Sequence, residues 1–261
     1  MERIAAGATH RGRVRVQNQD ALLLRPDLGL FAVADGLGGH AAGEVASTLA
    51  IQTLEQVIGS HVHAVSGQGM LDLLTRAART ANHVIHQRSL ANAAEAGMGT
   101  TLTAVLFEHD GNRWYAVHVG DSRLLRVRGG TIQQLTTDHT ILQESLDETG
   151  SSTHMPYHPA AHLLSRALGV SAQAEVDTKQ EELRKDDLLL LCSDGLTNML
   201  TEHQILWLLR PALSLEELCR RLLQSANEAG GTDNITAILI RAVGPAGARK
   251  EQERLPTQRS A

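Results

Sequence analysis

One stretch constrains this 261-residue chain more than any other: an apolar run at residues 28–33 leads through Ala34 to Asp35 and a cluster of glycines. Four glycines and one histidine fall between positions 36 and 43, before a helical pattern begins. The apolar run predicts a buried strand, and glycine permits backbone geometry that a side chain would forbid. We therefore expect Asp35 at a strand end beside bare backbone carbonyls, an arrangement that suits a hard divalent cation. The alternative is an ordinary turn in which the aspartate bonds to its own backbone.

The composition excludes several classes of protein. The formal net charge is −5 and the isoelectric point is about 6.2, so no global basic field attracts nucleic acid. Aromatic residues make up only 2% of the chain, too few for platforms on which bases stack. No stretch approaches the ~20 apolar residues of a membrane helix, and the N-terminus shows no secretory h-region. We therefore expect a cytoplasmic protein with no nucleic-acid or membrane partner, in which Cys192 and Cys219 are reduced core residues.

The order of the apolar patterns predicts an α+β fold with helices covering antiparallel sheets. Strands are expected on both sides of residues 15–20, and helical stripes follow at residues 41–60 and 70–92. Hairpins come next, and a last strand follows two helices that begin at capping boxes at Thr201 and Ser214. Threonine alternates with apolar residues at 100–107, which predicts a half-buried strand. The other strands expected in this half of the chain are 114–119, 124–127, 131–135, 187–193 and 235–242.

Aspartates recur next to the expected strand ends or glycine turns. Five of them occupy such places: Asp20, Asp35, Asp121, Asp194 and Asp233. If the fold brings all five to one cleft, their mutual repulsion requires cations to offset it. Oxygen ligands without a histidine or cysteine cluster favour Mg²⁺ or Mn²⁺ over zinc. A pair of such ions provides what phosphate hydrolysis needs, an activated water and a clamp on the developing negative charge.

Arg15 lies five residues before Asp20, between the first two expected strands. A guanidinium presents a planar fork that matches two phosphoryl oxygens. The two residues either form an ordinary surface pair or bring a donor fork and a carboxylate to the mouth of one site. The residues alone leave both interpretations open.

Residues 138–168 lack a regular pattern apart from a short helix expected near residues 141–148. A long loop inside a compact domain is usually functional, so we interpret this segment as a flap over a cleft. His154 and His158 invite a zinc interpretation, but no cysteine joins them and their spacing matches no zinc site. The polar residues 243–261 are expected to form a disordered tail, which leaves residues 1–242 as one domain.

Six short motifs follow one another along the chain. They are Arg15 with Asn18 and Asp20, residues 34–40 (ADGLGGH), 99–101 (GTT), 120–123 (GDSR), 192–196 (CSDGL) and 233–236 (DNIT). In this order they resemble the motifs of the metal-dependent protein phosphatases, the protein phosphatase 2C or PPM family, in its bacterial form. The match covers residues 3–242, and the order of the six motifs makes it specific.

The resemblance implies a four-layer αββα sandwich, in which two central antiparallel sheets are flanked by helix pairs and the metals lie at one end between the sheets. Asp35 would bridge two Mn²⁺ or Mg²⁺ ions, with the Gly36 carbonyl on one of them. Asp194 and Asp233 would complete the ligands of the other ion. Residues 1–242 would then be a PPM-type phosphatase catalytic domain.

The resemblance also assigns roles around this metal pair. Asp121 with Asp194 would hold a third, weaker ion, as in bacterial members. Asp20 would act in the outer shell through water molecules, and Arg15 would bind the substrate phosphate. The flap at residues 138–168 resembles the variable segment that tunes substrate access in the family.

Two positions depart from the family pattern. Many eukaryotic relatives have a histidine, proposed as the general acid toward the leaving group, where this chain has Leu37, which has no proton to give. His40 stands nearby and either replaces that histidine or caps the following helix. Gln19 stands where some members have a glutamate that helps to hold the second metal, so more water is expected around that ion here.

We expect a serine/threonine protein phosphatase that hydrolyses phosphoserine and phosphothreonine by in-line attack of a metal-bridging water, without a phosphoenzyme. No Cys-x5-Arg loop follows either cysteine and no Asp-x-Asp motif occurs, so a covalent route lacks its nucleophile. The resemblance further implies phosphorylated protein substrates, opposition to a Ser/Thr kinase in bacterial signalling, and a monomer. One rival is a partner-binding module that has lost catalysis, against which the five acids and Arg15 argue. The other is a regulator that acts on a single phosphoserine partner in a sigma-factor switch.

Overall fold

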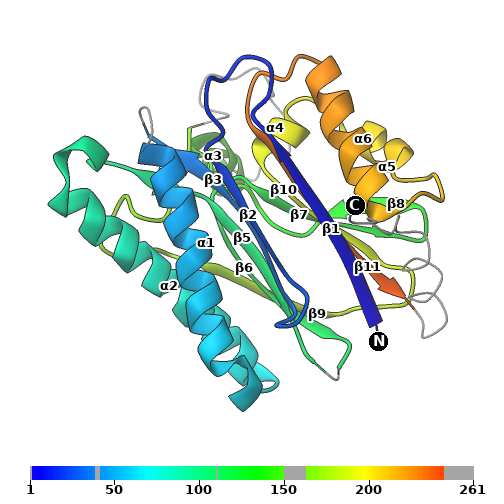
Figure 1. The fold of residues 1–261 in the computed structure, drawn as a ribbon, viewed down its shortest axis with the longest axis horizontal. Helices are drawn as coiled ribbons and strands as arrows, with labels where there is room; N and C mark the ends of the chain where they lie inside the picture. The colour runs from blue at the N-terminus through cyan, green and yellow to red at the C-terminus, as the bar shows by residue number, and fades with distance from the viewer. Residues whose placement is uncertain (1, 39–41, 110, 150–162, 244–261) are drawn as a thin grey trace, which may run out of the picture.

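Two antiparallel β-sheets pack face to face in the middle of the molecule, and helices cover the outer face of each sheet (Figure 1). The computed structural model describes residues 2–38, 42–109, 111–149 and 163–243. The layers run helices, sheet, sheet, helices, so the predicted α+β sandwich is confirmed. The expected tail from residue 244 onward and residues 150–162 of the expected flap lie outside the described residues.

The first sheet has the strand order β1-β11-β10-β7-β8. Its central strand β10 is a continuous apolar run because both of its faces are covered. β1 pairs with β11 along its whole length, from Glu2 opposite Val243 to His10 opposite Ile235. The strands of this sheet are β1 Glu2–His10, β7 Arg123–Arg128, β8 Thr131–Gln134, β10 Leu188–Cys192 and β11 Ile235–Val243.

The second sheet has the strand order β2-β3-β5-β6-β9, and the short β4 also pairs with β3. β5 is buried at every position, not half-buried as its alternating sequence predicts. Its two faces contact two different cores, one under the helices and one between the sheets. The strands of this sheet are β2 Asp20–Arg25, β3 Leu30–Leu37, β4 Gly99–Thr100, β5 Leu102–Phe107, β6 Arg113–Val119 and β9 Asp177–Glu182.

Two groups of helices form the outer layers. α1 (Ala42–His61) and α2 (Gln68–Ala91) cover the second sheet, while α4 (Asp194–Thr197), α5 (Glu202–Leu208) and α6 (Leu215–Glu228) cover the first. The capping box predicted at Thr201 is confirmed, and the Ser214 hydroxyl accepts a hydrogen bond from the Glu217 amide at the start of α6. The remaining helices are α3 (Ile141–Thr149) and two 3₁₀ turns, η1 (Val62–Ala64) and η2 (Ala93–Glu95).

One strand, β9, has no counterpart in the sequence predictions. Its sequence, DTKQEE, contains no apolar residue, and every position is exposed or half-buried. It pairs with β6 at the edge of the second sheet, where only one side of the strand meets a neighbour. A strand that buries so little carries no apolar alternation by which a pattern could reveal it.

Both cysteines are free and buried, as expected for reduced core residues. Burial raises the pKa of Cys192 and of Cys219 to about 12, so neither thiol ionises readily. Within the described residues, no helix is long and apolar enough to cross a membrane.

His118 on β6 is buried together with His139 at the base of the expected flap. The two rings lie with centroids 4.7 Å apart. Nδ1 of His118 lies 2.9 Å from the Thr103 hydroxyl, and Nε2 lies 3.0 Å from the Thr137 carbonyl oxygen. Burial, and then the neighbouring His139, lower the pKa of His118 from its ordinary value to about 4.

This lowered pKa predicts acid destabilisation. The unfolded chain takes up a proton on His118 near pH 6.5 while the folded chain does so only near pH 4, so stability falls as the pH decreases through this window. The nearby Asp138 and Asp177 oppose this effect and His139 adds to it. Between pH 7 and pH 4, we expect the protonation of His118 to lower the free energy of unfolding by about 3 kcal/mol. The His118→Gln variant should not show this loss. Urea unfolding of both proteins from pH 7 to pH 4 measures the difference; parallel curves would contradict the prediction.

Candidate metal centre

Asp20 and Asp35 lie opposite each other on paired strands. Asp20 begins β2 and stands in register with Asp35 on β3, so the two side chains share one face of the second sheet. The prediction that Asp35 lies at a strand end is wrong, because β3 continues to Leu37 through its pairing with β4. Two carboxylates placed directly opposite each other repel and destabilise the sheet. Their presence therefore indicates a role for the negative charge, such as binding a cation.

The other three acids reach the same end of the sandwich from separate elements. Asp121 lies in the turn from β6 to β7, Asp194 begins α4 after β10, and Asp233 immediately precedes β11. Burial first, and then the negative charges of the other four acids, raise the pKa of Asp35 well above its usual value. The five predicted acids therefore lie within electrostatic reach of one another, although they come from across the whole sequence.

Burial likewise raises the pKa of two other members of this acidic cluster. The pKa of Asp20 rises to about 7, with Asp194 and Asp233 adding to the effect of burial. The pKa of Asp121 rises to about 8, with further contributions from Asp194 and Asp138. Burial and the neighbouring negative charges both disfavour the ionised carboxylates. A bound cation would supply the positive charge that stabilises them.

Neutral hydroxyl groups orient Asp20. Its Oδ2 accepts hydrogen bonds from Ser193 Oγ at 2.8 Å and from Thr236 Oγ1 at 2.6 Å. The Thr236 hydroxyl lies 2.7 Å from the Thr9 hydroxyl, and the Thr9 hydroxyl accepts a hydrogen bond from the side-chain Nδ2 of Asn18. The other oxygen, Asp20 Oδ1, is buried and has no hydrogen-bond partner within the described residues. One carboxylate oxygen is thus fixed, and the second is left for a ligand or water.

The threonines of the GTT motif hold the backbone of Asp35. Its carbonyl oxygen accepts from the Thr100 hydroxyl and the Thr101 amide, each at 2.9 Å, and its amide donates to Thr101 Oγ1. Thr101 Oγ1 also lies 2.7 Å from Ser122 Oγ, in the corner that carries Asp121. The motif therefore ties two acid-bearing segments together, a role that its sequence alone did not reveal.

Gly36 lies where the backbone is too crowded for a side chain. A Cβ atom at this position would stand 2.1 Å from the Gly43 carbonyl oxygen and 2.7 Å from that of Gln19. The Gly36 amide donates to the Gln19 carbonyl oxygen at 3.1 Å. The glycine predicted to offer a carbonyl beside Asp35 is thus required by close packing at the acidic cluster.

Arg15 forms its ion pair with Asp233 and not with Asp20. Its Nη2 lies 2.6 Å from Asp233 Oδ2, and half of the Arg15 side chain remains exposed. The interpretation of Arg15 and Asp20 as a surface pair is therefore wrong, and the guanidinium lies instead against another acid of the cluster. Residues 39–41 lie outside the described part of the chain, so the structure leaves the role of His40 untested.

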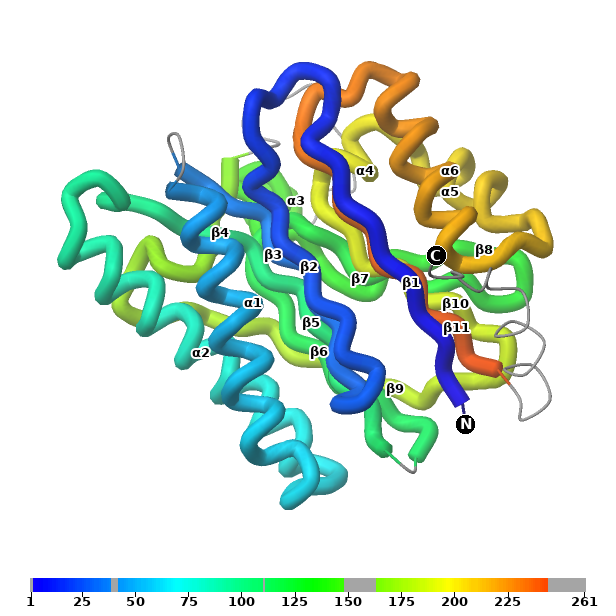
Figure 2. Tube along the Cα trace, in the orientation of Figure 1, coloured from blue at the N-terminus to red at the C-terminus, as the bar shows by residue number. Residues whose placement is uncertain are grey.

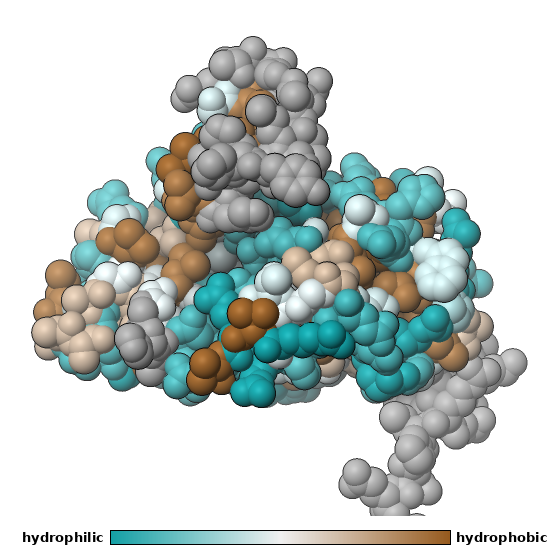
Figure 3. Space-filling view, turned by 90° about the horizontal axis from the view of Figure 1, so that it is seen from above, coloured by the Kyte–Doolittle hydropathy of each residue, from teal (hydrophilic) through white to brown (hydrophobic). Residues whose placement is uncertain are grey.

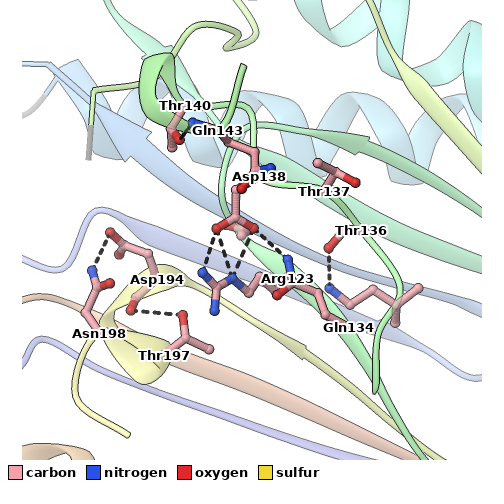
Figure 4. Close-up of polar contacts among 12 residues, drawn as sticks. Arg123, Gln134, Thr136, Thr137, Asp138, Thr140, Gln143, Asp194, Thr197 and Asn198 are labelled. Carbon is pink, nitrogen blue, oxygen red and sulfur yellow. Dashed lines mark hydrogen bonds and ion pairs between the residues drawn. The ribbon is translucent and has the colours of Figure 1, made fainter. Parts of the chain in front are cut away.

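A second arginine lies deeper, beside Asp194 (Figure 4). Arg123 on β7 stands opposite Cys192 on β10, two residues before Asp194. Its guanidinium binds Asp138 through Nε at 3.0 Å and Nη2 at 2.6 Å, and Gln134 donates to the same carboxylate. Asp194 Oδ2 instead accepts from the Asn198 amide at 2.9 Å. Arg123 thus neutralises Asp138 at the start of the expected flap and leaves the acids of the cluster to other partners.

The donor set fits a hard divalent cation. Within the described residues, no three His, Cys, Asp or Glu side chains converge as a ready-made set of metal ligands. The cluster nevertheless offers only oxygen donors, an unbonded buried oxygen on Asp20, and raised carboxylate pKa values that positive charge would relieve. The chemistry and charge of the residues therefore fit Mg²⁺ or Mn²⁺.

The crowding at Gly36 predicts a site-specific effect of one methyl group. Gly36→Ala is expected to displace Asp35, lowering stability by about 1–3 kcal/mol and Mn²⁺ affinity by roughly tenfold or more. Gly59→Ala on α1 is the matched control, because its nearest neighbour would be a Leu28 methyl at 3.6 Å. It is expected to gain about 0.5–1 kcal/mol and to keep its affinity. Thermal unfolding and calorimetric Mn²⁺ titration test both variants, and equal metal affinities would contradict the role of Gly36.

Comparisons with known proteins agree with this geometry. The family model described as protein phosphatase 2C matches residues 6–240. The serine/threonine phosphatase stp of Listeria welshimeri is 36% identical over 237 residues, which cover 89% of this chain and 93% of that protein.

Solved structures agree as well. The crystal structure of the Mycobacterium tuberculosis serine/threonine phosphatase PstP/Ppp is 36% identical, with a TM-score of 0.84 over 93% of this chain and 99% of that one. The catalytic domain of PstP in complex with two manganese ions is 37% identical, with a TM-score of 0.81 and the same coverage. The extent of these matches, over a fold that gathers the five acids of the sequence motifs, shows that this chain belongs to the protein phosphatase 2C family.

Proposed function

We propose that this chain is a metal-dependent serine/threonine protein phosphatase that hydrolyses phosphoserine and phosphothreonine in proteins. The observation that carries the proposal is the gathering of five aspartates at one end of the sandwich, with Arg15 paired to one of them at its rim. Family membership and the names of the relatives support it. A structural relative named as a complex with two manganese ions supports a metal pair, and the number and identity of the ions here are part of the proposal.

The metal ligands follow the positions in the acidic cluster. Asp35 lies centrally, since its pKa responds to all four other acids, and we assign it to both ions of the pair with the Gly36 carbonyl. Asp194 and Asp233 complete the pair. When bound, the ions would supply Lewis acidity, which activates a water molecule and stabilises negative charge on the phosphoryl group.

Two further acids have supporting roles in the proposal. Asp121, whose pKa responds to Asp194, would share a third ion with it. Asp20 is held by Ser193 and Thr236, and its free oxygen would orient a water molecule of the outer shell.

Arg15 would bind the phosphoryl oxygens of the substrate. Its guanidinium is half exposed and only one nitrogen is bonded to Asp233, so it can reach an incoming phosphate with small movement. His40 is the proposed proton donor to the leaving hydroxyl, since Leu37 at the end of β3 has no proton to give.

The wider role of the protein follows from the same chemistry. We propose phosphorylated proteins as substrates, a cognate Ser/Thr kinase as the opposing enzyme, a monomer, and a cytoplasmic location. Residues 1–242 would form the catalytic domain, and residues 138–168 the flap that controls access to it. The first residues of the flap are held beside the acidic cluster, because Asp138 pairs with Arg123 and the His139 amide donates to the Gly120 carbonyl oxygen.

Release of phosphate from a phosphothreonine peptide tests the proposal. The chain with Mn²⁺ is expected to turn over, and Asp35→Ala and Asp194→Ala are expected to lower the rate by roughly two orders of magnitude or more. EDTA is expected to abolish activity. Turnover that survives EDTA would exclude the mechanism, and a folded, manganese-loaded chain without turnover would favour a partner-binding module instead.

A separate variant tests the third ion. Asp121→Ala is expected to retain the two tighter Mn²⁺ sites, measured by calorimetry, and to lose at least roughly tenfold in kcat, because only the third ion depends on Asp121. Turnover equal to that of the parent would remove the third site from the proposal.

A further inference from the structure

The loop between β1 and β2, residues 11–19, carries Arg15 and lies beside the segment that precedes β11 (Figure 2). The Gly231 carbonyl oxygen accepts from the Arg13 amide at 2.7 Å and from the Val14 amide at 3.3 Å. Gly12 adopts φ +80°, and a Cβ there would stand 2.1 Å from the Asp233 carbonyl oxygen. The backbone of the loop is therefore in direct contact with the backbone that carries a proposed metal ligand.

Little apolar packing holds the tip of this loop. Val14 and Val16, on either side of Arg15, are 66% and 85% exposed. Figure 3 looks onto this end of the molecule, where hydrophobic and hydrophilic surface alternate. A loop with an exposed tip keeps a defined shape only through hydrogen bonds at its base.

A single buried side chain supplies three of those bonds. Asn234, which is 3% exposed, donates through Nδ2 to the carbonyl oxygens of Arg11 and Gln17, each at 2.9 Å. Its Oδ1 accepts from the Gln19 amide at 2.8 Å. Both amide protons and the oxygen are used, and the bonded residues lie at the start and at the end of the loop.

The same side chain joins the loop to the other sheet. The Gln19 carbonyl oxygen accepts from the Gly36 amide at 3.1 Å and from the Ser47 hydroxyl at 2.6 Å. The backbone N–H and C=O of Gln19 therefore link Asn234, next to Asp233, with Gly36, next to Asp35. Asn234 closes the loop at the point where the two sheets meet.

We infer that Asn234 is a positioning residue that acts through Arg15: it closes the loop of residues 11–19 so that the guanidinium is held ready for the substrate phosphate. The inference rests on the proposed role of Arg15 in phosphate binding. A loop that is already ordered loses less conformational entropy when the phosphate binds, so the amide raises affinity without touching the substrate.

The structure offers a matched control for this amide. Asn82 on α2 is 2% exposed, donates through Nδ2 to the carbonyl oxygens of Ser171 and Ala172, and accepts from the Gly169 amide. It has the same burial and bonding pattern as Asn234 but closes a different loop. Asn82→Ala and Asn234→Ala remove the same chemistry at two places.

Steady-state kinetics with Mn²⁺ and a phosphothreonine peptide test the inference. Asn234→Ala is expected to raise KM and to weaken inhibition by inorganic phosphate, each by roughly tenfold, with Mn²⁺ affinity unchanged within about threefold. Asn82→Ala is expected to lose similar thermal stability with neither kinetic change. Equal kinetic effects of the two variants, or a loss of Mn²⁺ affinity in Asn234→Ala as large as the rise in KM, would overturn the inference.

Asn234→Asp provides a second variant if the alanine variant does not fold. It keeps the shape and the bond from Gln19, and it removes both donated bonds that hold the loop. The added negative charge beside Asp233 also repels phosphate directly. The loop is therefore identified as the cause if Asn234→Asp weakens phosphate inhibition in the parent but not in Arg15→Ala. Unchanged phosphate inhibition in this variant would contradict the inference.

A double-mutant cycle separates this inference from the proposed function. If Asn234 acts through Arg15, the double variant Arg15→Ala/Asn234→Ala should have the same kcat/KM as Arg15→Ala within about twofold. Losses that multiply would overturn the positioning role while leaving the phosphatase intact. Arg15→Ala with the parent's KM and phosphate inhibition would instead show that the proposed role of Arg15 fails.

Discussion

Repulsion among clustered, buried and half-buried carboxylates is the constraint on which the rest of this structure depends. Asp20 and Asp35 face each other across two strands, and three further acids lie within electrostatic reach. Such an arrangement opposes folding, since each charge raises the free energy of its neighbours. The two apolar sheets and their helices must supply enough stability to hold the cluster together before any cation arrives.

In the sandwich, the residues that stabilise the fold and the residues of the acidic cluster occupy different parts of the molecule. The core between the sheets, which includes Phe31, Phe107 and Trp114, and the two cores under the helices are apolar. The five acids of the cluster collect at one end, where strands of both sheets begin or end. Glycine is needed there because segments approach closely: a Cβ on Gly195 would lie 2.0 Å from the Asn234 carbonyl oxygen.

The sequence was informative where a residue's role depends on its immediate neighbours. Apolar periodicity located most helices and strands, and the motifs located the acids, because each acid adjoins its own strand or glycine turn. The polar edge strand β9 was missed, since it buries too little to leave a pattern. The partner of Arg15 was also missed, because it lies 218 residues away and only the pairing of distant strands brings it near. Sequence spacing contains no information about such contacts unless a family resemblance supplies it.

The chemical character of the groups around the acids has a functional consequence. Serine, threonine and asparagine orient the carboxylates and the loop of Arg15, as in the bonds from Ser193 and Thr236 to Asp20. Neutral donors fix an oxygen without cancelling its charge, so the negative potential remains available to divalent ions. An arginine in their place would compete with the metals, and the half-buried arginine nearby, Arg123, forms its ion pair with Asp138 instead. Arg15, which is bonded to Asp233, is half exposed and can leave this acid for a phosphate.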